Sequence, residues 1–192
     1  MAVIVGVIGL GPMGGNIARK LLEKEFKVVG YDLILEKILA LEDTGIEVAQ
    51  DCLELAENSD VIITSLPNIN SLEAVINDIT KSTKMGQIVI ECSTLEVRQK
   101  IEVADKLQKA GKVMLDAPIS ATPSMLAEGM ASIHIGGDKM AYDECLQIFE
   151  GFTAKKIFVA CLKYTTEASE EKKSQHIEYS RIIKNIDGGG GG

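Results

Sequence analysis

Tryptophan is absent from this 192-residue sequence, and aromatic residues make up only 4% of it. Histidine occurs twice, and the four cysteines lie far apart without a C-x-x-C pair, so the sequence predicts a reducing compartment and no metal site. Basic residues are outnumbered: 20 Lys and Arg face 28 Asp and Glu, which leaves a formal charge of −8. This sign repels phosphate backbones and anionic membrane surfaces, so we expect neither nucleic acid nor a membrane as a partner.

Long hydrophobic runs are also missing. The apolar start at residues 2–10 has no basic segment before it and is interrupted by Gly6 and Gly9, which is typical of neither a signal peptide nor a membrane span. We therefore expect a cytoplasmic protein. Hydrophobic residues reach 46% and charged residues 25%, enough for a globular core. The length suits one domain of about 150 residues with an appendage.

Short β-branched runs alternate with longer stretches of helical periodicity. Seven segments are typical of strands: residues 3–8, 26–31, 61–66, 88–92, 113–115, 130–136 and 156–159. This alternation is the pattern of βαβ units, and it predicts an α/β protein with a Rossmann-type, doubly wound and mostly parallel sheet.

Several polar residues stand where helices are expected to begin. Asp51 precedes one helical stretch, and a single helix is expected at about residues 138–149. Asn70 with Glu73 suits a helix start, and Ser93 with Glu96 matches the S-x-x-E capping box. We expect capping at both places, by Asn70 and by Ser93 or Thr94.

The composition changes after Cys161. We take residues 1–161 as the Rossmann-type domain, 162–187 as a helical extension or the remnant of an interdomain helix, and 188–192 as a glycine linker or artefact. Tyr179, Ile182, Ile183 and Ile186 follow helical spacing and predict one amphipathic C-terminal helix. Its apolar stripe would pack on the domain or on a second copy, so a homo-oligomer is expected.

One glycine-rich string follows the first predicted strand. It reads Gly9-Leu10-Gly11-Pro12-Met13-Gly14, and Asp32 comes 18 residues after Gly14, at the end of the second predicted strand. Gly9 would permit a tight turn, Gly11 would let the backbone approach a diphosphate, and Gly14 would let the helix pack on the strand. In this context the string predicts cofactor binding by its six residues and Asp32; the alternative is a purely structural turn.

Asp32 also bears on the choice of cofactor. A carboxylate there would accept hydrogen bonds from the adenosine ribose and repel a 2′-phosphate, and residues 33–35 offer no arginine for that phosphate. NAD is therefore predicted over NADP. The alternative interpretation of Asp32 is an acid that ends a strand in a turn.

Several further blocks appear in a fixed order along the chain. They are Val7-Ile8 before the glycine string, Leu66-Pro67 with Asn70, Ser93-Thr94, Asp116-Ala117-Pro118-Ile119-Ser120 and Gly136-Gly137-Asp138. With these blocks the chain, from residue 1 to about 160, resembles the β-hydroxyacid dehydrogenases. That family includes 3-hydroxyisobutyrate dehydrogenase, tartronate semialdehyde reductase and glyoxylate or succinic semialdehyde reductases.

The resemblance implies an NAD-dependent hydride transfer with a small carboxylate substrate, a β-hydroxyacid or semialdehyde acid. It implies that Leu66, Pro67, Asn70 and Thr94 line the nicotinamide end of the cofactor and that Ser120 touches the substrate carboxylate. The alternative is a purely structural role: Asn70 and Thr94 would cap helices, and the Ser120 hydroxyl would lie in a loop without contacting a ligand.

The sequence departs from the family pattern in two blocks. Ala121 and Thr122 stand where the family has two glycines, and no lysine matches the family's G-x-x-x-K-x-x-N-N block, because the chain reads Ala160-Cys161-Leu162-Lys163-Tyr164-Thr165. The catalytic residue is therefore unassigned, and we expect these 192 residues not to include the family's full helical second domain. Three interpretations follow: an oxidoreductase represented mainly by its cofactor domain, a non-catalytic NAD-binding module, or a truncated chain without stable function.

Overall fold

A central nine-stranded sheet organises residues 3–160, the part of the chain that this computed structural model describes. Its strands in chain order are β1 (Ile4–Ile8), β2 (Lys27–Tyr31), β3 (Glu47–Val48), β4 (Val61–Thr64), β5 (Ile88–Glu91), β6 (Val113–Asp116), β7 (Ile119–Ser120), β8 (Ser132–Gly137) and β9 (Lys155–Ala160). Their order in the sheet is β3-β2-β1-β4-β5-β6-β8-β7, with β9 also paired to β8.

The sheet is mostly parallel, which confirms the prediction from the alternating pattern. Strands β3, β2, β1, β4, β5 and β6 all run in one direction. Strand β8 is antiparallel to β6 and β7, and β9 lies parallel to β8. The chain builds outward from β1 through β2 to β3 and then crosses over to β4 on the other side of β1. In such sheets ligands bind at the carboxyl ends of the strands flanking this switch.

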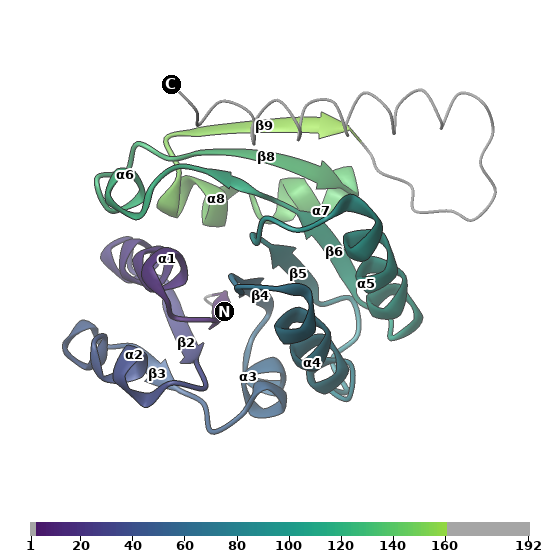
Figure 1. Ribbon diagram of the computed structural model, residues 1–192, viewed down its shortest axis with the longest axis horizontal. Helices are drawn as coiled ribbons and strands as arrows, with labels where there is room; N and C mark the ends of the chain where they lie inside the picture. The colour runs from purple at the N-terminus through teal and green to yellow at the C-terminus, as the bar shows by residue number, and fades with distance from the viewer. Residues whose placement is uncertain (1–2, 161–192) are drawn as a thin grey trace.

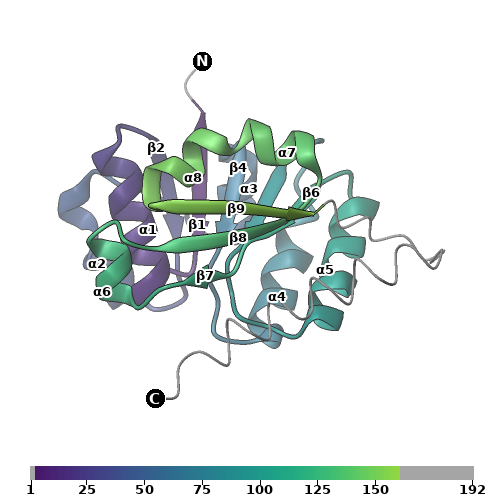
Figure 2. The same cartoon turned by 90° about the horizontal axis from the view of Figure 1, so that it is seen from above.

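Helices cover both faces of the sheet (Figures 1 and 2). They are α1 (Pro12–Glu23), α2 (Leu35–Leu39), α3 (Cys52–Asn58), α4 (Ile69–Ile79), α5 (Val97–Lys109), α6 (Pro123–Ala127), α7 (Lys139–Glu144) and α8 (Leu146–Phe152), with the short 3-10 helix η1 at Glu42–Thr44. Side chains of α1, α6, α7 and α8 join one hydrophobic core, and those of α3, α4 and α5 join the other.

Neighbouring residues of the central strands point into different cores. In β4, Val61 and Ile63 belong to the α1 side, whereas Ile62 belongs to the α3–α5 side. Successive side chains of a strand alternate between the faces, and both faces are covered, so apolar residues are favoured at successive positions of such a strand. This explains why the strands read as continuous hydrophobic runs.

Helix capping was predicted correctly in one place and wrongly in another. The Asp51 carboxylate accepts a hydrogen bond from the Glu54 amide at 2.7 Å, which confirms it as the cap of α3. The cap of α4 is Asn68, which accepts from the Ser71 amide at 2.9 Å. Asn70 lies inside the first turn and is exposed. The backbone of Asn68 is extended and α4 begins at Ile69, two residues earlier than the Asn70–Glu73 pattern indicated.

The Ser93–Glu96 capping box is not formed. Helix α5 begins at Val97, its N-cap is Glu96, and no side chain caps it. The Ser93 side chain is buried instead, and its hydroxyl accepts a hydrogen bond from the Leu66 amide at 2.9 Å. Thr94 is exposed. The Ser93 side chain therefore makes a tertiary contact to Leu66 instead of capping the helix as the local pattern predicted.

The helix expected at about residues 138–149 is divided at Cys145 into α7 and α8. The short elements β3, β7 and α6 were not predicted. The amphipathic segment at residues 179–186 lies outside the described residues. Between residues 3 and 160, no helix is both long and apolar enough to cross a membrane.

Candidate dinucleotide-binding site

The first glycine of the string makes the turn that leaves β1. Gly9 has a φ of +89°, a conformation that side chains with a Cβ rarely adopt. A Cβ at this position would also lie 2.3 Å from the carbonyl oxygen of Ser65. The amide of Gly9 donates to the carbonyl of Tyr31 at 2.9 Å, which joins the turn to the end of β2. The tight turn predicted for Gly9 is confirmed.

The other two glycines differ in their surroundings. A Cβ at Gly14 would lie 1.8 Å from the carbonyl oxygen of Gly9, so this glycine lets α1 pack directly on the turn. A Cβ at Gly11 would meet only the Lys37 Nζ, at 3.9 Å. Gly11 is the N-cap of α1, and no side chain bonds to the amides of its first turn. These amides can therefore donate hydrogen bonds to an anionic group.

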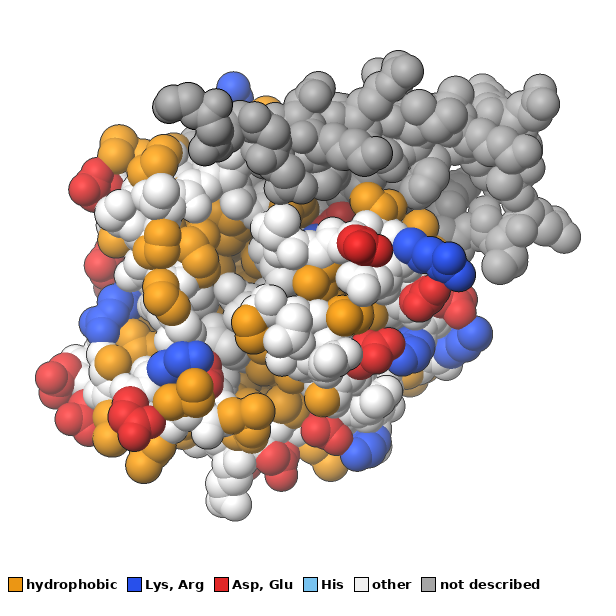
Figure 3. Space-filling view, viewed as in Figure 1, with side chains coloured by type: hydrophobic (Ala, Val, Ile, Leu, Met, Phe, Trp, Pro, Cys, Tyr) orange, Lys and Arg blue, Asp and Glu red, His pale blue; other side chains and the backbone are white. Residues whose placement is uncertain are grey.

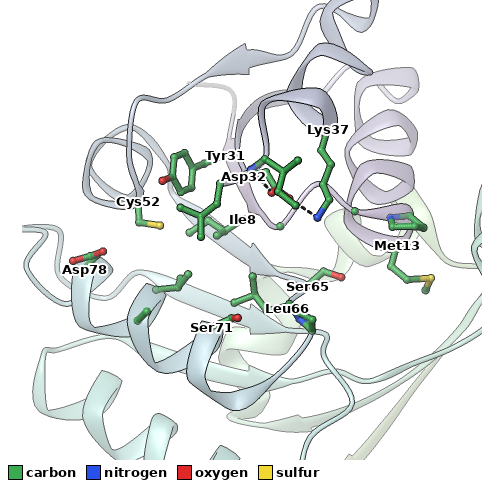
Figure 4. Close-up of a pocket in the computed structure, with 18 residues that line it drawn as sticks. Ile8, Met13, Tyr31, Asp32, Lys37, Cys52, Ser65, Leu66, Ser71 and Asp78 are labelled. Carbon is green, nitrogen blue, oxygen red and sulfur yellow. Dashed lines mark hydrogen bonds and ion pairs between the residues drawn. The ribbon is translucent and has the colours of Figure 1, made fainter.

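A cleft of about 480 Å³ opens beside the glycine turn (Figure 4). Its lining residues come from the end of β1 and the turn, from the end of β2 and the segment after it, from the start of α3, and from the β4–α4 connection and α4 itself: Ile8, Gly9, Gly11, Pro12, Met13, Tyr31, Asp32, Leu33, Ile34, Lys37, Cys52, Ser65, Leu66, Pro67, Ser71, Ala74, Val75 and Asp78. The cleft thus lies at the carboxyl ends of β1, β2 and β4, where the strand order reverses. Figure 3 shows hydrophobic side chains reaching the surface on the side of this face where α1 and α2 lie.

Asp32 is held by three groups of the protein. Its Oδ2 accepts from the Leu10 amide at 2.8 Å, and its Oδ1 accepts from the Ile34 amide at 2.9 Å. The Lys37 Nζ lies 3.5 Å from Oδ2 (Figure 4). Each carboxylate oxygen can accept more than one hydrogen bond, so a ligand hydroxyl can still bind there.

Lys37 is a cleft residue that the sequence reasoning missed. Residues 33–35 contain no arginine, but the first turn of α2 brings Lys37 back toward Asp32. Its side chain is 38% exposed, whereas that of Asp32 is 7% exposed, so the lysine is the solvent-exposed member of this ion pair. A helix beginning at Leu35 would have indicated that Lys37, in its first turn, can lie near Asp32.

The opposite end of the cleft from Met13 holds Tyr31, Cys52 and Asp78 (Figure 4). Burial raises the pKa of the Cys52 thiol to about 12, and the charges of Asp78 and Asp51 act in the same direction. Burial likewise raises the pKa of Tyr31. Both groups are therefore neutral at physiological pH, and Asp78 beside them pairs with Lys81 at 2.7 Å.

The structure gathers most of the predicted cofactor residues around the cleft. Seven of them line the cleft: Gly9, Gly11, Pro12, Met13, Asp32, Leu66 and Pro67. Leu10 contributes the amide that binds Asp32, and Gly14 packs behind the turn. Asn70, Thr94 and Ser120 are not among the lining residues; Ser120 lies on β7 and is partly exposed. No cluster of three or more His, Cys, Asp or Glu side chains suited to a metal ion occurs in residues 3–160.

A glycine turn that opens a helix at the switch point of a parallel sheet, with an acid at the end of the second strand, defines a dinucleotide-binding domain of the Rossmann type. Residues 4–164 match the family described as the NAD binding domain of 6-phosphogluconate dehydrogenase, and the chain belongs to this family.

The relatives of the chain are dehydrogenases. It is 35% identical to human mitochondrial 3-hydroxyisobutyrate dehydrogenase over 136 residues, which cover 69% of this chain and 40% of that enzyme. It is 28% identical to an NAD-dependent L-serine dehydrogenase of Pseudomonas aeruginosa over 159 residues, 81% of this chain and 53% of that protein. The chain therefore spans about half, or less, of the length of the relatives it matches.

Solved structures share the fold. A Mycobacterium tuberculosis 3-hydroxyisobutyrate dehydrogenase with L-serine superposes with a TM-score of 0.81 at 24% identity, over 84% of this chain and 55% of that one. An imine reductase variant from Myxococcus stipitatus in complex with NAD⁺ gives 0.79 at 15% identity, over 97% of this chain and 64% of that one. The mostly parallel sheet with flanking helices is thus common to both.

Proposed function

We propose that this chain is the cofactor-binding part of an NAD-dependent oxidoreductase that transfers a hydride between nicotinamide and a small β-hydroxyacid or semialdehyde acid. One observation carries the proposal: the backbone at Gly11 is open toward a cleft whose rim also holds the Asp32 carboxylate. The space beside Gly11 fits a diphosphate, and the side chain of Asp32 fits a ribose. When bound, the dinucleotide would supply the hydride chemistry.

Different parts of the cleft would hold different parts of the dinucleotide. The turn at residues 9–14 and the first amides of α1 would bind the diphosphate, because helix N-termini attract anions. Asp32 would bind the adenosine ribose. Leu66 and Pro67 form the wall contributed by the β4–α4 connection. The family resemblance adds Asn70 and Thr94 at the nicotinamide end and Ser120 at the substrate carboxylate.

NAD is the cofactor we propose over NADP. The Asp32 carboxylate would lie beside a 2′-phosphate and repel it, and its own hydrogen bonds to Leu10 and Ile34 hold it at the rim. Among the described residues that line the cleft, Lys37 is the cationic side chain that would attract such a phosphate, and it is paired with the carboxylate at 3.5 Å. A cation that already pairs with a carboxylate attracts a second anion less strongly than an unpaired cation does.

A titration of the 192-residue chain with NADH, followed by fluorescence, tests the proposal. Saturable binding is expected, together with NADH oxidation in the presence of succinic semialdehyde, glyoxylate or methylmalonate semialdehyde. The absence of binding would overturn the proposal. Binding without turnover on any of the three favours the second candidate, a non-catalytic NAD-binding module. That candidate is favoured by the sequence at residues 160–165, where the family's acid-base lysine is not matched.

Two further parts of the proposal concern the cell and assembly. We propose a reducing compartment, the cytoplasm, because Cys52, Cys92 and Cys145 are all buried free thiols. We also propose a homo-oligomer, built through the amphipathic segment at residues 179–186. Analytical ultracentrifugation of the chain and of a version lacking residues 165–192 tests the second point. A monomer in both would remove it.

A further inference from the structure

Three charged side chains are buried together near the carboxyl edge of the sheet. Glu91 is the last residue of β5, Asp116 is the last residue of β6, and Lys100 comes from α5. The Lys100 Nζ lies 2.8 Å from Glu91 Oε2 and 2.5 Å from Asp116 Oδ1. The exposed fractions are 0% for Glu91, 3% for Lys100 and 2% for Asp116. We call these three residues the buried charge cluster.

The lysine is what allows the two carboxyl groups to sit side by side. Burial raises the pKa of Glu91 and Lys100 opposes this, while burial lowers the pKa of Lys100 and both carboxylates together raise it above the ordinary lysine value. Lys100 therefore remains charged in the folded protein. Without it, two acids at neighbouring strand ends would repel each other in a medium that screens charge poorly.

A continuous set of contacts leads from the cluster to the cleft. Glu91 Oε1 accepts a hydrogen bond from the Ser93 amide at 2.7 Å. The Ser93 hydroxyl, 5% exposed, accepts in turn from the Leu66 amide at 2.9 Å. Leu66 and the next residue, Pro67, line the cleft. The position of this wall therefore depends on a serine that a buried glutamate holds in place.

The same cluster also touches the segment that follows β6. Asp116 immediately precedes Ala117, and the Ala117 amide donates to the carbonyl of Glu91 at 2.8 Å. The chain then runs through the buried Pro118 to Ser120 on β7. The connection after β4 and the segment after β6 are thus both anchored to residues at or just beyond the end of β5.

We propose that Lys100 is a positioning residue for the dinucleotide cleft, acting through Glu91 and Ser93 on the wall formed by Leu66 and Pro67. This inference rests on the proposed cofactor function. Lys100 does not touch the ligand: it holds two carboxylates so that one of them can orient Ser93. Its loss would move the wall and weaken dinucleotide binding at temperatures where the protein is still folded.

Ser93→Ala is the first test, because it removes the contact to Leu66 and leaves the three charges in place. Its matched control is Ser59→Ala. Ser59 is also buried, at 0% exposure, and its hydroxyl donates to a backbone carbonyl, that of Leu55, but Ser59 does not line the cleft. We expect NADH affinity to fall about fivefold to tenfold in Ser93→Ala and to stay unchanged in Ser59→Ala.

Lys100→Met is the second test, alone and combined with Ser93→Ala. If Lys100 acts through Ser93, the single variant weakens NADH binding about tenfold and adds little in the Ser93→Ala background. Hydrogen exchange of the Leu66 amide should accelerate in both single variants and not in Ser59→Ala. If Lys100→Met does not fold, the double variant Lys100→Met with Asp116→Asn is used instead. This double variant leaves Glu91 as the one carboxyl group in the cluster.

The outcomes separate this inference from the proposed function. Failure of the unaltered chain to bind NADH overturns the proposed function and this inference with it. Normal NADH binding by the unaltered chain and by Ser93→Ala overturns the positioning role alone. A loss of affinity in Lys100→Met that is fully additive with that of Ser93→Ala also overturns it, because the two residues would then act independently.

Discussion

The carboxylate of Asp32 accepts a hydrogen bond from the backbone amide of Leu10 at 2.8 Å. The end of β2 is thereby joined to the centre of the glycine turn, 22 residues earlier in the chain. A single side chain thus orders the backbone expected to hold a diphosphate and also presents the acceptor expected to hold a ribose. This dual attachment determines how variants of Asp32 must be interpreted.

Replacing Asp32 should change the choice between cofactors. In Asp32→Ala we expect the ratio of NADH to NADPH affinity to fall at least about tenfold, because the repulsion of a 2′-phosphate is lost and Lys37 becomes unpaired. The ratio is the relevant quantity, since disturbing the turn would weaken both cofactors. Asp60→Ala is the control, because the Asp60 carboxylate also accepts a hydrogen bond from a backbone amide. That amide belongs to Ile4, at the other end of β1, and the distance is 2.9 Å. An unchanged ratio in Asp32→Ala would refute the ribose contact.

Alanine at Gly11 and at Gly14 should have opposite effects. Gly11→Ala places a methyl group in open space, so its free energy of unfolding should stay within about 1 kcal/mol of the unaltered chain, while NADH affinity falls at least about tenfold. Gly14→Ala places a methyl group 1.8 Å from the Gly9 carbonyl and should cost more than about 2 kcal/mol of stability. Urea unfolding and NADH titration measure the two quantities. Undiminished binding by Gly11→Ala would contradict the diphosphate assignment.

Truncating Lys100 should destabilise the protein strongly. Lys100→Met leaves two buried carboxyl groups without their cation, for which we expect a loss of about 3 to 5 kcal/mol. Lys106→Met on the same helix is the matched control: Lys106 pairs with Glu73 at 3.5 Å on the surface, so its removal should cost less than about 1 kcal/mol. Chemical denaturation of both variants provides the comparison. Similar losses in the two would mean that the buried charge cluster contributes no more than a surface pair.

Buried thiols should make the protein less stable in alkali. Burial raises the pKa of Cys145 to about 12 from an ordinary value of 9.0. The folded state therefore keeps a proton that the unfolded chain releases, and the free energy of unfolding falls as pH rises through about 9. Between pH 8 and pH 10 the unaltered chain should lose about 1 kcal/mol more than Cys145→Ala, measured by urea unfolding at each pH. Parallel pH profiles for the two proteins would show that this thiol titrates normally.

The two asparagines at the start of α4 should differ in role. Asn68→Ala removes the cap and should lower the free energy of unfolding by about 1 kcal/mol. Asn70→Ala, at an exposed position inside the first turn, should leave stability within about 0.5 kcal/mol. If Asn70 contacts the nicotinamide end, as the family resemblance implies, its variant weakens cofactor binding without this loss of stability. Equal NADH affinity in Asn70→Ala and the unaltered chain would leave Asn70 with neither role.

The central strands and the glycine turn could be predicted because their requirements are local. Ile62 and Ile63 point to opposite faces of a covered sheet, so both must be apolar, and the run is visible in the sequence. Gly9 adopts a backbone conformation that favours glycine, and Asp32 ends the strand that follows it at the spacing expected for this motif. Such constraints operate within one strand or one βαβ unit.

The helix starts after β4 and β5 were predicted less well, because tertiary partners competed for the same residues. Ser93 matches a capping box, yet the Leu66 amide, 27 residues earlier, occupies its hydroxyl. Lys37 became part of the cleft only when α2 folded back on Asp32. Neither contact leaves a periodic signal, since each depends on where two separate segments meet.

The sequence by itself determined the alternating α/β plan and the glycine turn after the first strand, because hydrophobic periodicity and glycine conformation act over short stretches of chain. Only the tertiary structure decided that Lys100 lies between Glu91 and Asp116 and that Ser93 supports the wall of the cleft. A charged residue on a helix normally indicates a solvated surface. Whether it is buried depends on carboxylates that the fold brings to it from two different strands.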